Sequence, residues 1–235
     1  MSIAVISDLH LGARPSTDSF GHEDGEFLRF LRFLERNFER VVLLGDIWET
    51  LTGGLPHRAA EELRLARERH PEIAARLRHP KYTFVHGNHD LVTGRVDGAP
   101  SELRIRRGGV RVLFAHGHQG DALVMKARPV SELGVWLGGW IRRAGMHAAY
   151  KLLDGLDQQH AHDAPEGKAS AVERWALERA AGVEADVVVT GHTHVACNVE
   201  RGDRVFLNSG SCSKGRISYL SIEPRLGSYR IHTSF

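Results

Sequence analysis

The stretch "VVVTGHTHV", residues 187–195, is an apolar run that ends in two histidines. Its three consecutive valines favour a β-strand, because branched side chains pack well on a pleated sheet. His192 and His194 follow directly, and both can bind a metal ion. With 15 histidines among 235 residues, one such pair is expected by chance. The ends of the other apolar runs therefore decide what this pair means.

Six apolar runs are short enough to be strands, and their continuous apolarity predicts burial on both faces. They are "IAVIS" from Ile3, "VVLL" from Val41, "YTFV" from Tyr82, "VRVLFA" from Val110, "DVVV" from Asp186 and "RVFL" from Arg204. Helix-like stretches begin at Asp24 and His57, between the first three runs. This alternation predicts a layered α/β architecture, and residues 215–235 predict two further antiparallel strands around a Pro/Gly turn.

Residues 122 to about 180 interrupt this alternation, because the segment is far longer than a usual connection between helix and strand. We expect one domain over residues 1–235, with a helical insertion at 122–180 that caps the active site. Trp136 and Trp140 lie four residues apart in it, and Arg142 and Arg143 follow. Such a surface suits acyl chains or peripheral contact with an anionic membrane. Packing against another helix or another subunit would explain it equally well, so both interpretations stay open.

Composition restricts the class of protein. Lys and Arg total 31 against 29 Asp and Glu, so the net charge of +2 predicts no nucleic-acid partner. Two cysteines are too few for a disulfide framework and indicate a reducing compartment. The N-terminus lacks the basic leader of a signal peptide, and no apolar run reaches the roughly 18 residues of a membrane span. We therefore expect a soluble, cytoplasmic protein.

Five of the strands end in side chains that can bind metal ions. The strand ends read "SDLH", "LLGD", "VHGNHD", "FAHGH" and "VTGHTH". The carboxyl ends of parallel strands lie at one edge of a sheet, so these side chains are expected to meet. These donors are oxygen and nitrogen atoms without thiolate. They suit Mn²⁺, Fe, Co²⁺ or Zn²⁺ in a five- or six-coordinate site better than a structural zinc site. The candidate ligands are Asp8, His10, Asp46, Asn88, His116, His192 and His194.

These motifs together resemble the calcineurin-like metallophosphoesterase superfamily, in the same order and with similar spacing. The motifs are "DLH" (8–10), "GD" (45–46), "GNHD" (87–90), "HGH" (116–118) and "GHTH" (191–194). The resemblance implies a four-layer α/β/β/α sandwich that holds two divalent metal ions, with Mn²⁺ as the expected metal.

The resemblance also implies roles for individual residues. One metal ion would be bound by Asp8, His10, Asp46 and His194. The second would be bound by Asp46, Asn88, His116 and His192, so that Asp46 bridges the two ions. His89 would match the family's non-ligand histidine, which contacts the phosphoryl oxygen or protonates the leaving group. Asp90 would match the residue that orients this histidine.

A narrower resemblance concerns the substrate. The chain length, the block "GDIWE" (45–49) and the insertion are most similar to bacterial UDP-2,3-diacylglucosamine hydrolases, which cleave a pyrophosphate in lipid A biosynthesis. His89 departs from the arginine that is common at this position in those enzymes. A phosphomonoesterase, a protein phosphatase or a cyclic nucleotide phosphodiesterase remains an alternative, as does a metal-free scaffold of the same fold.

Overall fold

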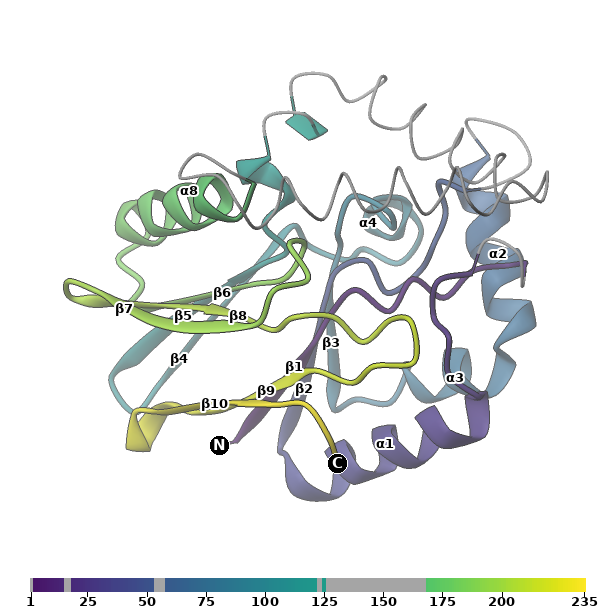
Figure 1. Ribbon diagram of the computed structural model, residues 1–235, viewed down its shortest axis with the longest axis horizontal. Helices are drawn as coiled ribbons and strands as arrows, with labels where there is room; N and C mark the ends of the chain where they lie inside the picture. The colour runs from purple at the N-terminus through teal and green to yellow at the C-terminus, as the bar shows by residue number, and fades with distance from the viewer. Residues whose placement is uncertain (1, 15–17, 53–57, 122–123, 126–167) are drawn as a thin grey trace.

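Two five-stranded sheets pack face to face in the computed structural model, which describes residues 2–14, 18–52, 58–121, 124–125 and 168–235 (Figure 1). The first sheet has the order β10-β9-β1-β2-β3. Its strands β1 to β3 are parallel, and β9 and β10 extend it antiparallel. The strand bounds are β1 Ile3–Ile6, β2 Arg40–Leu44, β3 Tyr82–Val85, β9 Tyr219–Glu223 and β10 Ser228–His232.

The second sheet has the order β4-β5-β6-β8-β7. Strands β5, β6 and β8 are parallel, and the edge strands β4 and β7 run antiparallel to their neighbours. The strand bounds are β4 Glu102–Arg107, β5 Val110–Ala115, β6 Val187–Thr190, β7 Cys197–Arg201 and β8 Arg204–Asn208. All six strands expected from apolar runs are therefore confirmed, and they divide equally between the two sheets.

Helices cover the outer face of each sheet. Helix α1 (Asp24–Asn37) packs its apolar face against the first sheet and contacts α3 (Pro71–Arg76). Helix α2 (Ala59–Arg69) contacts both α3 and α4 (Val92–Val96). Helix α8 (Lys168–Gly182) packs Ala176 and Ala180 against the second sheet. Short 3₁₀ turns, η1 (His118–Gly120) and η2 (Pro224–Leu226), follow β5 and β9. The result is the expected four-layer α/β/β/α sandwich.

The continuous apolarity of β1 follows from its place between two cores. Ala4 and Ile6 point towards α1, whereas Ile3 and Val5 point into the core between the sheets. Successive side chains of a strand face opposite sides, so a strand buried on both faces must be apolar at every position. Sequence patterns predicted such central strands well for this reason.

Two strands, β4 and β7, were not anticipated. Their sequences "ELRIRR" and "CNVER" are charged, and about half of their side chains are exposed. Both strands lie at edges of the second sheet, where charged residues prevent pairing with other chains. The C-terminal pair, expected around a Pro/Gly turn, is confirmed as β9 and β10.

Part of the expected insertion at 122–180 belongs to the sandwich itself, since residues 168–180 lie in α8 on the second sheet. Residues 122–123 and 126–167, which include Trp136, Trp140, Arg142 and Arg143, lie outside the described residues. Within the described ranges, no helix has both the length and the apolarity needed to cross a membrane.

Candidate metal centre

The backbone is strained where the expected ligands lie. Seven residues other than glycine have a positive φ in the part of the chain that the structure describes, and five of them are expected ligands: Asp8, His10, Asp46, His192 and His194. A left-handed conformation costs a residue with a Cβ atom of order 1–3 kcal/mol and is concentrated at functional sites. Backbone hydrogen bonds hold it in place, from Asp8 N to Gly45 O (3.0 Å) and from His10 N to Asp46 O (2.9 Å).

Glycines allow the motifs to approach one another. A Cβ atom on Gly87 would lie 2.1 Å from Asp46 Oδ1, and one on Gly45 would lie 2.5 Å from the ring nitrogen Nδ1 of His116. Both separations are far below van der Waals contact, so no other residue fits without displacing an expected ligand. The glycine that precedes Asp46 and the one that precedes Asn88 are therefore required by packing between segments.

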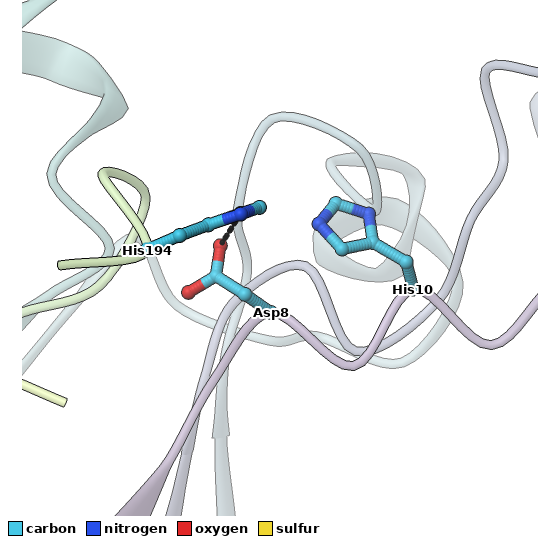
Figure 2. A group of neighbouring side chains, drawn as sticks. All are labelled: Asp8, His10 and His194. Atoms are coloured by element: carbon cyan, nitrogen blue, oxygen red, sulfur yellow. Dashed lines mark ion pairs between the residues drawn. The ribbon is translucent and has the colours of Figure 1, made fainter. Parts of the chain in front are cut away.

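A first cluster consists of Asp8, His10 and His194, whose candidate ligand atoms all lie within 4.8 Å of one another. Figure 2 shows the ring of His194 beside the carboxylate of Asp8, with the ring of His10 facing His194. His194 Nε2 lies 3.1 Å from Asp8 Oδ1. The other oxygen, Asp8 Oδ2, accepts hydrogen bonds from the Ser7 hydroxyl and from His192 N (3.1 Å). Oδ1 is therefore the oxygen left to bind a cation.

A second cluster consists of Asp46, His116 and His192, again with candidate ligand atoms within 4.8 Å of one another. His116 Nδ1 lies 2.8 Å from Leu44 O and must donate to it, because a carbonyl oxygen only accepts. The other nitrogen, Nε2, faces Asp46 Oδ2 at 3.1 Å. Burial lowers the pKa of His116, but Asp46 and Asp8 outweigh burial and raise it to about 9, so a metal ion at Nε2 would take the place of a proton. His116 Nε2 is also 3.9 Å from Asp8 Oδ1, so the two clusters adjoin.

Unsatisfied atoms indicate what this site binds. Six buried side-chain nitrogen or oxygen atoms of the described residues have no hydrogen-bond partner. Four of them belong to expected ligands: Asp8 Oδ1, His10 Nε2, Asn88 Oδ1 and His116 Nε2. A buried polar atom without a partner costs about 1–3 kcal/mol, and bound cations would satisfy all four. The donor chemistry and these four atoms both fit divalent metal ions.

The electrostatics keep both carboxylates ionised. Burial alone would raise the pKa of Asp8, but His194 and His116 outweigh burial and hold that pKa well below its usual range. Burial also opposes ionisation of Asp46, yet His116 and His89 keep its pKa well below the ordinary value. An ionised carboxylate is the form that binds a metal ion.

A third group, beside the first cluster, consists of His10, Glu49 and His89. Glu49 Oε2 lies 2.8 Å from His89 Nδ1 and 3.3 Å from His10 Nδ1. Its other oxygen accepts hydrogen bonds from the backbone N–H groups of Leu51 (2.9 Å) and Thr52 (3.2 Å). The buried carboxylate of Glu49 is thus fixed and fixes two imidazoles in turn.

His89 is therefore surrounded by negative charge. Burial lowers the pKa of His89, but the carboxylates of Glu49 and Asp46 outweigh burial and raise it to about 10. His89 N also donates to Asp46 Oδ1 at 2.8 Å, which ties it to the second cluster. The His89 ring therefore carries a proton at neutral pH, which is the form that a general acid needs.

Asp90 makes different contacts from those expected. Its carboxylate accepts hydrogen bonds from the backbone N–H groups of Gly87 (2.6 Å), Ile47 (2.8 Å) and Trp48 (3.2 Å). These bonds tie the loop after β3 to the loop after β2. The carboxylate in contact with the His89 ring is that of Glu49, which lies in "GDIWE" and has no role predicted from the sequence. Only its spacing, three residues after Asp46, marks it in the sequence.

The chain is similar to known phosphoesterases over most of its length. The family model for calcineurin-like phosphoesterase matches residues 1–196. A UDP-2,3-diacylglucosamine hydrolase from Ralstonia nicotianae is 27% identical over 222 residues, which cover 82% of this chain and 76% of that protein. One from Serratia proteamaculans is 33% identical over 130 residues, which cover 50% of this chain and 48% of that protein. Among solved structures, a Vps29 mutant from Entamoeba histolytica is 18% identical with a TM-score of 0.49, covering 100% of this chain and 98% of the other.

Proposed function

The chain belongs to the calcineurin-like phosphoesterase family, and from this premise we propose that it uses two divalent metal ions to hydrolyse a phosphoester or pyrophosphate bond. The observation that carries the proposal is the set of four unsatisfied buried atoms on Asp8, His10, Asn88 and His116. A metal-free scaffold would gain little from burying such atoms, because a buried polar atom that makes no hydrogen bond lowers the stability of the fold.

In this proposal the ligands divide as the family resemblance implies. Asp8, His10 and His194 bind one ion, Asn88, His116 and His192 bind the other, and Asp46 bridges the two. Two bound ions supply an activated water near neutral pH and bind the phosphoryl oxygens. The expected metal is Mn²⁺, since the set holds carboxylate, amide and imidazole donors without thiolate.

We assign the proton transfer to His89. Its imidazolium donates a proton, or a hydrogen bond, to the oxygen that leaves. Glu49 holds the ring through Nδ1 and stabilises its charge, so Nε2 is the nitrogen that we assign to the substrate. Asp90 acts through the backbone, because it keeps Gly87 close to Asp46.

For the substrate we propose a UDP-2,3-diacylglucosamine-like lipid precursor, cleaved at its pyrophosphate as in lipid A biosynthesis. Support comes from relatives that carry this name, one of which matches 82% of the chain. The "GDIWE" block, which supplies Asp46 and Glu49, points the same way. A phosphomonoesterase, a protein phosphatase or a cyclic nucleotide phosphodiesterase is the rival function of the same centre.

The decisive experiment assays the purified protein with Mn²⁺ on UDP-2,3-diacylglucosamine and identifies the products, with EDTA and Asp46→Ala as controls. We expect UMP and the lipid monophosphate, and neither product in the controls. Cleavage of a chromogenic phosphomonoester without cleavage of the lipid would favour the rival function. Failure to bind metal or to hydrolyse any phosphoester would identify a scaffold.

A further inference from the structure

Asp121 contacts an expected metal ligand, although no motif in the sequence marks it. It follows η1 directly, and its Oδ2 lies 3.0 Å from His192 Nε2. Both side chains are buried, with 9% of Asp121 and 6% of His192 exposed. The interaction therefore takes place in a low-dielectric setting, where a carboxylate strongly determines the state of its partner.

This contact determines which nitrogen of His192 can bind a metal ion. An ionised carboxylate only accepts, so Nε2 must carry the hydrogen, which leaves the lone pair of the neutral ring on Nδ1. We propose that Asp121 is a positioning residue that fixes the tautomer and orientation of His192, so that Nδ1 binds the metal ion at Asp46 and His116. The inference rests on the proposed metal centre and extends it to a residue outside the ligand set.

Two other expected ligands, His116 and His10, support this assignment. Leu44 O accepts from one nitrogen of His116, and Glu49 faces one nitrogen of His10. In both rings the opposite nitrogen, Nε2, is buried without a hydrogen-bond partner. Asp121 plays the same part for His192, except that it contacts Nε2, so that Nδ1 is the nitrogen proposed to bind the metal ion. A carboxylate behind a metal-binding histidine also raises the basicity of the ligand.

The structure holds Asp121 firmly in this position. Asp121 N donates to His118 O (3.1 Å), Asp121 Oδ1 accepts from Val124 N (3.3 Å), and Oδ2 faces the histidine. Gly120 lies directly on α8, because a Cβ atom there would be 2.8 Å from Trp175 Cβ. The packing of η1 against α8 thus places the carboxylate beside His192.

Metal binding tests the proposal without reference to any substrate. Protein stripped with EDTA is titrated with Mn²⁺ by calorimetry, and bound metal is counted by elemental analysis. We compare wild type, Asp121→Ala, Asp121→Asn and a matched control, Asp186→Asn. Asp186 directly precedes β6 and accepts hydrogen bonds from Arg111, which is not an expected ligand.

We expect wild type and Asp186→Asn to bind two equivalents. Asp121→Ala should bind one of the two about 10- to 100-fold more weakly, the usual effect of removing such a partner, and the other unchanged. The affinity of Asp121→Asn for this equivalent should lie between those of wild type and Asp121→Ala, because its amide oxygen still accepts a hydrogen bond from Nε2 but carries no charge. The melting temperature of the metal-free protein should change little.

Other results would overturn the inference. Unchanged affinity for both equivalents in Asp121→Ala would exclude a role in metal binding, and equal weakening of both would show a general structural role. If the alanine variant fails to fold, Asp121→Asn decides, since it must weaken one equivalent selectively. Wild-type protein that binds no Mn²⁺ would overturn the proposed metal centre itself. If wild type and Asp121→Ala both bind two equivalents with the same affinity, only the role of Asp121 is refuted.

Discussion

Replacing Gly87 with alanine should disable the site although no expected ligand is substituted. The new Cβ atom would lie 2.1 Å from Asp46 Oδ1 and 2.6 Å from Asp46 N, whereas ordinary contact begins near 3.4 Å. Rotating the carboxylate cannot relieve the overlap with the backbone nitrogen, so one of the two segments must move by about 1 Å. Displacements of about 1 Å cost roughly 10²-fold in turnover, and overpacking costs about 1–3 kcal/mol of stability.

The assay measures bound Mn²⁺, turnover of a chromogenic phosphodiester and the melting temperature for wild type and Gly87→Ala. Gly25→Ala is the matched control, since Gly25 lies in α1 with nothing within 4 Å of an added Cβ atom. We expect Gly87→Ala to lose metal and about 10²-fold in turnover, while Gly25→Ala behaves as wild type. Two tightly bound ions and wild-type turnover in Gly87→Ala would refute the reasoning that this contact positions the bridging carboxylate.

Three further changes test other parts of the site and fold. His89→Asn should keep both metal equivalents and lower kcat by about 10²-fold, the size of a general-acid contribution, so wild-type kcat would remove His89 from the mechanism. Glu49→Gln keeps an oxygen that accepts from Leu51 N and Thr52 N but removes the negative charge beside His89. The steady-state kcat should therefore fall by about 10-fold or more. A Glu49→Gln enzyme with full kcat would show that the contact is not used. His70 lies between Asp18 Oδ2 (3.1 Å) and Asp24 Oδ1 (2.7 Å). Burial lowers the pKa of His70, but these two hydrogen bonds outweigh burial and raise it above 6.5. A histidine whose pKa is raised by folding stabilises the folded protein at pH values below its pKa in the unfolded state. This contribution is lost as the pH rises through the pKa of the folded state. The difference in melting temperature between wild type and His70→Gln should therefore be largest below pH 6.5 and shrink as the pH rises above that value, and a constant difference would contradict it.

The roles of the acidic residues were the least predictable part of the site. Asp90 adjoins His89 in the sequence, yet its carboxylate binds backbone N–H groups of two loops. Glu49, 40 residues away, contacts the His89 ring instead. Neighbouring side chains in a turn diverge, so proximity in the sequence is a poor guide to contact there. Asp121 was missed for the same reason, because its partner His192 lies 71 residues further along the chain.

The amino-acid sequence by itself determined the layered architecture, the six central strands and the kind of donor at the end of each strand. Burial on both faces and the chemistry of a side chain are local properties, so a short stretch such as "VVVTGHTHV" displays both. The tertiary structure alone decided which nitrogen of His10, His116 and His192 contacts another protein group, and which group that is. Those choices depend on side-chain directions set by contacts between distant segments, such as His192 N with Asp8 Oδ2 across 184 residues. No local pattern encodes them, because they follow from how two sheets and their loops pack together.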